Sequence, residues 1–135
     1  LDTLLPKQEQ FSFVDLGSGC GGLLNNLAKV HKNGLFYGIE SAPLPLLISK
    51  LRSLPNHGSC QIFWGSFWEY DLSQYDVVYA YLSPVPMESL WRKVSKEMRP
   101  GSLLISNTFL IPGVTPHKSI QLNDFSNSTL YLWKI

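Results

Sequence analysis

Short apolar runs alternate along this chain with longer segments in which apolar residues recur every three or four positions. The runs favour buried strands, and the recurring pattern favours helices that pack along one side. An alternation of this kind predicts a parallel sheet with helices on both faces. Five strands are predicted before the C-terminal segment, at Phe11–Leu16, Leu35–Ile39, Cys60–Trp64, Asp76–Leu82 and Ser102–Leu110.

Three helices are predicted between these strands. The first covers Leu23–Val30, the second begins near Pro43, where proline is tolerated, and the third covers about Pro86–Met98. The second helix is expected to bury four apolar side chains, Leu47, Ile48, Leu51 and Leu54. The third helix is expected to bury a stripe of five, Met87, Leu90, Trp91, Val94 and Met98.

The C-terminal segment follows a different pattern. Residues 111–118 are too few and too rich in proline for a crossover helix. Two strands, SIQL at 119–122 and TLYLWKI at 129–135, are predicted to form a hairpin around a polar turn. The fold class is therefore α/β, a three-layer α/β/α sandwich around a mostly parallel seven-stranded sheet with a C-terminal antiparallel hairpin.

Length and composition agree with this fold and exclude some functions. The 135 residues favour a single domain, 1–135, and 44% hydrophobic with 16% charged residues is typical of a globular protein. The net charge of +1 gives no strong signal for nucleic acid. No run of about 18 apolar residues occurs, so no membrane-spanning segment is predicted. Because the chain begins at Leu1, an N-terminal segment is expected to be missing.

The cysteines and histidines give no metal-binding pattern. No C-x-x-C spacing occurs, and three isolated histidines, His31, His57 and His117, are each expected in exposed loops, so no metal site is predicted. Cys20 and Cys60 are expected to be reduced thiols. With no signal peptide, this favours a cytoplasmic protein.

Four glycines follow the first predicted strand, in the stretch FVDLGSGCGG. Gly17, Gly19 and Gly22 match the dinucleotide pattern G-x-G-x-x-G, and Gly17, Gly19 and Gly21 match G-x-G-x-G. In open parallel sheets, ligands bind beyond the carboxyl ends of the strands. Glycines there let backbone N–H groups approach a ligand, and the next helix adds partial positive charge. The loop predicts a ligand site without deciding the ligand.

Two carboxylates indicate which class of ligand the glycine loop binds. Asp15 stands two residues before Gly17, where a carboxylate repels a pyrophosphate but suits a cationic ligand. Glu40 ends the second strand, where a carboxylate can accept hydrogen bonds from ribose hydroxyls. The chain has no room for a second domain that would hold a substrate for hydride transfer.

With these features the sequence resembles the class I methyltransferases that use S-adenosylmethionine. The resemblance covers nearly the whole chain and rests on FVDLGSGCGG, YGIES, WGSFWEYD, YDVVYAYLSP and MRPGSLLIS. It implies a Rossmann-like fold, S-adenosyl-L-methionine as the cofactor, and transfer of a methyl group. The short link after the fifth strand and the stretch YLSP are also similar to lysine methyltransferases of the ATP synthase c-subunit type and their bacterial relatives.

The resemblance also implies roles for individual residues. Asp15 is expected near the methionine amino group of the cofactor, Glu40 on the ribose hydroxyls and Ser41 close to the adenine. Tyr81 is expected under the transferred methyl group. The full set of expected cofactor-binding residues is Asp15, Leu16, Gly17, Ser18, Gly19, Gly21, Glu40, Ser41, Ser66, Phe67 and Tyr81.

Some positions depart from the family pattern. Ser66 stands where relatives often carry an aspartate against the adenine, and Phe67 and Trp68 can alternatively be core aromatics. The stretch LSPVP lacks the Asn and aromatic residue of the N-P-P-Y motif, which argues against an amide or adenine acceptor. The methyl acceptor stays open between a protein lysine and a small molecule, and no catalytic residue is identified.

Two other functions stay open at this point. One is an NAD(P)-binding oxidoreductase fragment, against which Asp15 and the terminal hairpin argue. The other is a cofactor-binding module without activity of its own, since residues ahead of the glycine motif often close the cofactor site in relatives.

Overall fold

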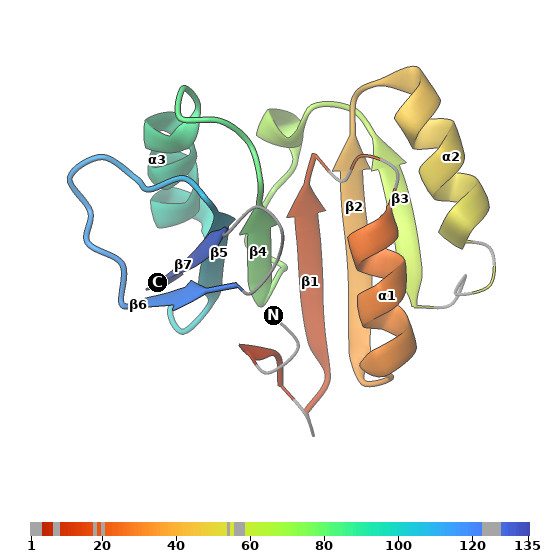
Figure 1. Cartoon of the computed structure of the whole chain (residues 1–135), viewed down its shortest axis with the longest axis horizontal. Coiled ribbons are helices and arrows are strands. Elements are labelled where there is room, and N and C mark those ends of the chain that lie inside the picture. The colour runs from red at the N-terminus through yellow and green to blue at the C-terminus, as the bar shows by residue number, and fades with distance from the viewer. Residues whose placement is uncertain are drawn as a thin grey trace. The chain divides into compact units, whose positions relative to one another are not determined.

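The computed structural model describes residues 4–6, 9–17, 19, 21–53, 55, 59–122 and 128–135. The chain divides into two compact units, Leu1–Tyr70 and Asp71–Ile135. Within the described residues, seven strands and three α-helices follow one another in the order that the sequence predicts (Figure 1).

The first unit is built on three parallel strands. Its elements are β1 (Phe11–Leu16), α1 (Gly22–Val30), β2 (Gly34–Glu40), α2 (Pro43–Ser53), β3 (Cys60–Trp64) and the 3-10 turn η3 (Phe67–Glu69). β2 lies between β1 and β3, with α1 against β2 and α2 against β3. Because the strands are parallel, their carboxyl ends meet at one edge of this sheet.

The second unit contains the C-terminal hairpin. Its elements are β4 (Val77–Ala80), α3 (Met87–Glu97), β5 (Leu103–Asn107), β6 (Lys118–Gln121) and β7 (Thr129–Lys134). β4 and β5 are parallel, and β7 runs antiparallel to both β5 and β6. The predicted antiparallel hairpin is therefore confirmed, although most of its turn, residues 123–127, lies outside the described residues.

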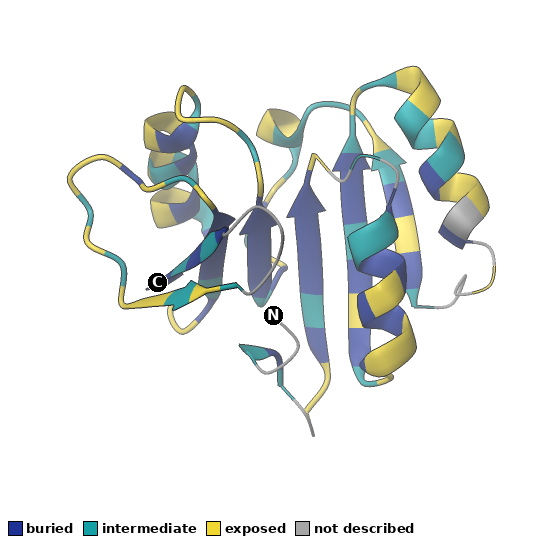
Figure 2. Ribbon diagram, viewed as in Figure 1, coloured by how far each residue is buried: buried dark blue, intermediate teal, exposed yellow. Residues whose placement is uncertain are grey.

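Each unit has its own buried centre, and the strands carry most of the buried residues (Figure 2). In the first unit, the Phe36 ring lies 5.6 Å from the rings of both Phe11 and Phe13. In the second, Trp133 is fully buried, and its indole N–H donates a hydrogen bond to the Val114 carbonyl at 3.2 Å. Tyr79 of β4 is also buried.

The predicted apolar face of the second helix is wrong. Leu47 and Leu51 are 57% and 59% exposed, whereas Ser49 and Ser53 are buried. Their hydroxyls donate hydrogen bonds to carbonyls one turn back in α2, which removes the cost of burying them. α2 therefore turns its small residues inward; Leu54 lies outside the described residues.

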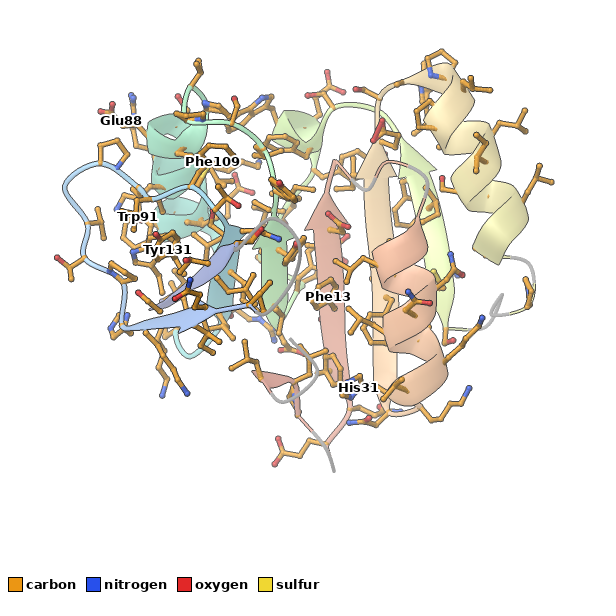
Figure 3. All side chains as sticks on the ribbon, in the orientation of Figure 1. Phe13, His31, Glu88, Trp91, Phe109 and Tyr131 are labelled. Atoms are coloured by element: carbon orange, nitrogen blue, oxygen red, sulfur yellow. The ribbon has the colours of Figure 1, made fainter. Side chains whose placement is uncertain are left out.

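Two further expectations are corrected or confirmed. His31 is buried rather than exposed, because its backbone N–H ends α1 on the Leu27 carbonyl and its ring packs edge-on against Phe11 at 6.2 Å (Figure 3). His117 is exposed as expected, and His57 lies outside the described residues. In the third helix, Met87, Leu90 and Val94 are buried as predicted.

Among the described residues, no helix has the length and apolar character needed to cross a bilayer.

Candidate functional site

The glycine loop leaves β1 in left-handed backbone conformations. Gly17 has φ 75° and Gly19 has φ 58°, values that residues with a side chain rarely adopt. The N–H of Gly17 donates to the Ile39 carbonyl at 2.9 Å, which ties the loop to β2, and Leu16 before it is fully buried. Among the described residues, none lies within 4 Å of the position that a Cβ of Gly19 would occupy. Ser18 lies outside the described residues.

Glu40, at the carboxyl end of β2, organises the loops around it. Its Oε2 accepts a hydrogen bond from the N–H of Gly19 at 3.0 Å, and its Oε1 accepts one from the N–H of Ala42 at 3.4 Å. Its backbone carbonyl accepts from Gly65 at 3.0 Å. One residue therefore links the glycine loop, the start of α2 and the loop after β3.

Asp15 supplies a second carboxyl at the same edge. Its side chain is 5% exposed. Burial, with added repulsion from Glu40, raises the pKa of the Asp15 carboxyl from 3.8 to about 8. At neutral pH this carboxyl is therefore protonated, and a positively charged ligand group beside it would favour its ionised form. The arrangement suits a ligand that carries both a cation and hydroxyl donors.

Gly21 has a packing role that the sequence pattern did not reveal. It precedes α1 with φ 77°, and a Cβ added there would lie 2.9 Å from the Cβ of Ser49 in α2. Its carbonyl accepts a 2.7 Å hydrogen bond from the Asn25 side chain. Gly21 thus allows the first turn of α1 to approach α2, and this contact explains the buried Ser49.

The end of β3 and η3 provide aromatic side chains near the start of α2. Trp64 is paired in register with Glu40, is 66% exposed, and donates its indole N–H to the Ser41 carbonyl at 3.3 Å. Ser66 and Phe67 are half-buried, and the Phe67 ring lies 4.4 Å from that of Trp68. Because Trp68 is 42% exposed, its alternative assignment as a core aromatic is wrong.

Sequence reasoning missed three residues at this edge: Asn25, Ala42 and Trp64. Ala42 contributes only its backbone N–H, which donates to Glu40, and the Asn25 side chain donates to the backbone carbonyl of Gly21. No pattern of residue types in the sequence indicates either contact. Trp64 could have been found from the sequence, because it ends the third predicted strand as Glu40 ends the second. Neighbouring parallel strands that end at the same edge place these two residues side by side.

Tyr81 belongs to the second unit. It follows β4 directly and is 52% exposed, and its ring lies 6.4 Å from that of Phe109, which follows β5. The other ten expected residues belong to the first unit.

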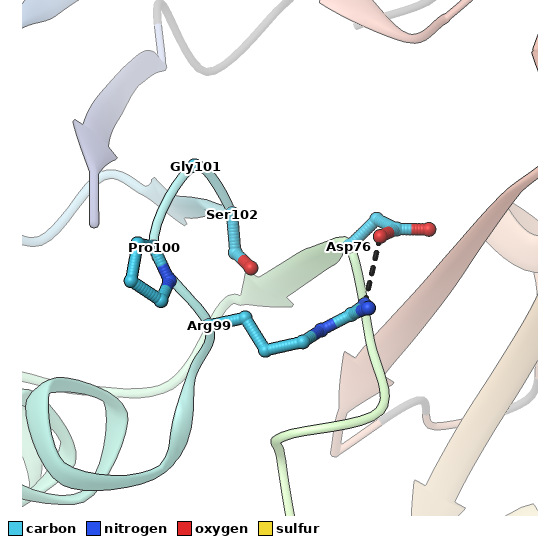
Figure 4. Close-up of a pocket in the computed structure, with 5 residues that line it drawn as sticks. All are labelled: Asp76, Arg99, Pro100, Gly101 and Ser102. Atoms are coloured by element: carbon cyan, nitrogen blue, oxygen red, sulfur yellow. Dashed lines mark hydrogen bonds and ion pairs between the residues drawn. The ribbon is translucent and has the colours of Figure 1, made fainter.

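A pocket of about 200 Å³ lies at the opposite, amino ends of β4 and β5. Asp76, Arg99, Pro100, Gly101 and Ser102 line it, and Asp76 pairs with Arg99 at 2.8 Å (Figure 4). Ligands of open parallel sheets bind at carboxyl ends, so this pocket is not the candidate site. Within the described part of the chain, no three His, Cys, Asp or Glu residues group as metal ligands.

Comparison with known proteins gives one family. Residues 15–118 match the family described as the ANTKMT methyltransferase domain. A protein-lysine N-methyltransferase from Saccharolobus islandicus (strain REY15A) is 31% identical over 124 residues, which cover 90% of this chain and 77% of that protein.

Solved methyltransferase structures share the fold of this chain. An RNA methyltransferase from Salinibacter ruber in complex with S-adenosyl-L-homocysteine superposes with a TM-score of 0.84 at 25% identity, over 93% of this chain and 80% of that one. A SAM-dependent methyltransferase from Thiobacillus denitrificans, also with S-adenosyl-L-homocysteine, gives 0.66 at 20% identity, over 78% of this chain and 45% of that one. The predicted Rossmann-like fold is thereby confirmed.

Proposed function

This chain belongs to the family of ANTKMT methyltransferase domains and is an S-adenosylmethionine-dependent methyltransferase, and we propose that its acceptor is the side-chain amine of a protein lysine. Family membership decides against the alternatives of an NAD(P)-binding fragment and a module without activity. The protein-lysine N-methyltransferase that shares 31% identity over most of this chain supports the lysine acceptor. The missing N-P-P-Y motif supports it too, because an amide or adenine acceptor is disfavoured.

The first unit holds the residues that we propose bind the cofactor. The main supporting observation is the position of the Glu40 carboxylate. Its Oε2 accepts a hydrogen bond from the N–H of Gly19 at 3.0 Å, which holds the carboxylate in place. The carboxylate is held beside the glycine loop, where its remaining acceptor capacity can receive ribose hydroxyls. The buried carboxyl of Asp15 fits the cationic amino group of the same ligand. The proposed set also keeps Leu16, Gly17, Ser18, Gly21, Ser41, Ser66, Phe67 and, in the second unit, Tyr81.

The protein's chemical task in this reaction is limited. When bound, the cofactor supplies an electrophilic methyl group on a sulfonium. The chain must hold that group still, position a neutral amine behind the methyl carbon, and exclude water. A lysine ammonium must first lose a proton before its neutral amine can attack, because its usual pKa is about 10.4, and the methylated nitrogen then carries the positive charge that leaves the sulfonium.

We also propose that residues 1–135 form a single cofactor-binding domain and that the protein acts in the cytoplasm. The first proposal is supported by the fold match, which extends over 93% of this chain. The second is supported by Cys60, which is a free, buried thiol.

Calorimetric titration with S-adenosylhomocysteine, with NAD as the comparison ligand, tests the site. We expect micromolar binding of S-adenosylhomocysteine, no binding of NAD, and a loss of about tenfold or more in affinity for Glu40→Gln, since charge-assisted hydrogen bonds are worth about 1.5–3 kcal/mol. Glu88→Gln, which removes an exposed carboxylate of α3, serves as the matched control and should bind like the wild type. Equal affinity of the Glu40→Gln variant and the wild type would contradict the assigned role of Glu40.

A further inference from the structure

We propose that the outward face of α2 docks on the surface of a lipid membrane that contains anionic headgroups. Neither the cofactor nor the acceptor lysine takes part in this interaction, so it goes beyond the proposed function. Three leucines that remain in contact with solvent, Leu44, Leu47 and Leu51, form this face. We call them the leucine stripe.

The leucine stripe follows one side of the helix. Its members are three and four residues apart, a spacing that aligns side chains along one face of an α-helix. They are 67%, 57% and 59% exposed, whereas Ser49 and Ser53, on the opposite side, are buried. Exposed positions run along the whole of α2 in Figure 2. α2 therefore turns its apolar side to solvent and its small polar side to the rest of the unit.

This orientation distinguishes the stripe from ordinary surface leucines. Single exposed apolar residues occur on every protein and need no explanation. Three on one helix face form a continuous apolar surface, and such surfaces mark sites where proteins bind partners or membranes. The stripe is therefore better explained as a contact surface than as chance exposure.

An exposed tryptophan lies at the N-terminal end of the stripe. The indole N–H of Trp64 donates to the Ser41 carbonyl at 3.3 Å, and Ser41 stands three residues before Leu44. Trp64 is 66% exposed. Tryptophan is enriched where proteins meet the headgroup region of a membrane, because its ring is apolar and its N–H is polar. Trp64 therefore suits the same lipid surface as the leucines.

The charges of α2 favour an anionic surface. The two charged residues in its sequence, Lys50 and Arg52, are both basic. Lys50 is exposed beside the stripe, and no described carboxylate forms an ion pair with it. Cations beside an apolar helix face are typical of helices that lie in the interface of anionic membranes. Charge and apolar character thus indicate the same partner.

The size and shape of this surface argue against a protein partner. Counting about 200 Å² for each of the three leucines and Trp64, a value typical of a buried aromatic residue, the exposed fractions give at most about 500 Å². A stable protein interface buries about 800 Å² on each partner. Protein interfaces also need complementary shapes, whereas lipid accepts the apolar side chains of a single convex helix without a matching groove.

Sedimentation of the full chain with lipid vesicles tests the proposal. We expect the wild type to bind vesicles of phosphatidylcholine and phosphatidylserine, mixed at about two to one, and to bind pure phosphatidylcholine at least about fivefold more weakly. The leucine variant, Leu44→Gln with Leu47→Gln and Leu51→Gln, should bind the mixed vesicles about tenfold or more weakly. Lys50→Gln should lose about fivefold on the mixed vesicles only, the effect of one cation near such a surface.

A second triple variant, Val30→Gln with Val85→Gln and Leu110→Gln, is the matched control. These apolar side chains are 63%, 89% and 50% exposed but lie outside α2, so the control should bind within about twofold of the wild type. Because all six replaced side chains are exposed, both triple variants should stay folded, and urea unfolding checks this.

The depth of contact is measured separately with lipids brominated on their acyl chains. These lipids should quench tryptophan fluorescence of the wild type, and Trp64→Phe should lose most of this quenching. Equal vesicle binding by the wild type and the leucine variant, or no binding by the wild type, would overturn the proposal. A wild type that binds no vesicles but forms a dimer, which the leucine variant does not form, would instead assign the stripe to a second copy of the chain. None of these measurements depends on methyl transfer, so their failure would leave the proposed function unaffected.

Discussion

Replacing Asp15 with asparagine is expected to stabilise the ligand-free protein at high pH. Asp15 is 5% exposed, and burial followed by repulsion from Glu40 raises the pKa of its carboxyl from 3.8 to about 8. Asp15→Asn keeps the shape of the side chain and removes the charge. The substitution therefore removes a group whose ionisation opposes folding.

The sign follows from proton binding to the two states. Below about pH 4 both folded and unfolded chains carry the proton, so Asp15 ionisation does not affect stability. Between about pH 4 and pH 8 only the folded chain keeps it, and the free energy of unfolding falls by about 1.4 kcal/mol per pH unit. Above pH 8 both states have lost the proton, so the free energy of unfolding falls no further on account of Asp15. A pKa shift from 3.8 to about 8 corresponds to a total loss of at most about 6 kcal/mol in that free energy.

Urea unfolding of both proteins at about pH 5 and about pH 8.5 measures this effect. We expect the stability of Asp15→Asn relative to the wild type to increase by several kcal/mol between these values. Asp71→Asn is the matched control, because hydrogen bonds from Ser73 lower the pKa of this exposed carboxyl, and it should give no gain at high pH. A stability difference between Asp15→Asn and wild type that is the same at both pH values would show that the pKa of the Asp15 carboxyl is not raised in the folded protein.

Substitutions at four other positions, Gly21, Leu47, Ser49 and Trp133, test the packing within each unit. Gly21→Ala should cost about 2–4 kcal/mol in urea unfolding, from its positive φ and the contact with Ser49, and Ser49→Gly in the same chain should recover only the contact part. Leu47→Gln should change stability by less than about 0.5 kcal/mol, whereas Ser49→Leu should cost about 1–3 kcal/mol; the opposite ranking would contradict the orientation of α2. Trp133→Ala should cost about 3–5 kcal/mol by thermal or urea unfolding, and a loss below about 1 kcal/mol would contradict its place in the core.

The strands and the glycine loop could be predicted from the sequence because they depend on local patterns. The third strand, Cys60–Trp64, has the predicted bounds, and the loop follows β1 as expected. The orientation of α2 could not be predicted in this way. Leucines at helical spacing normally face the core, but the close approach at Gly21 leaves space only for Ser49 on that side.

In the candidate site too, some features could be predicted from the sequence and others could not. Asp15 and Glu40 were identified from their positions at strand ends, where the fold places ligands. The raised pKa of Asp15 and the hydrogen bond from Gly19 to Glu40 depend on burial and on distances between residues far apart in the sequence.

Transfer of an isotopically labelled methyl group from S-adenosylmethionine to protein lysines, located by mass spectrometry, tests the proposed activity and its acceptor together. The wild-type protein should place label on lysine side-chain nitrogens, and Glu40→Gln should place far less at a limiting cofactor concentration. Label on RNA or a small molecule, with none on lysine, would contradict the proposed acceptor. No transfer to any acceptor, together with no binding of S-adenosylhomocysteine, would contradict both the methyltransferase function and the proposed cofactor site.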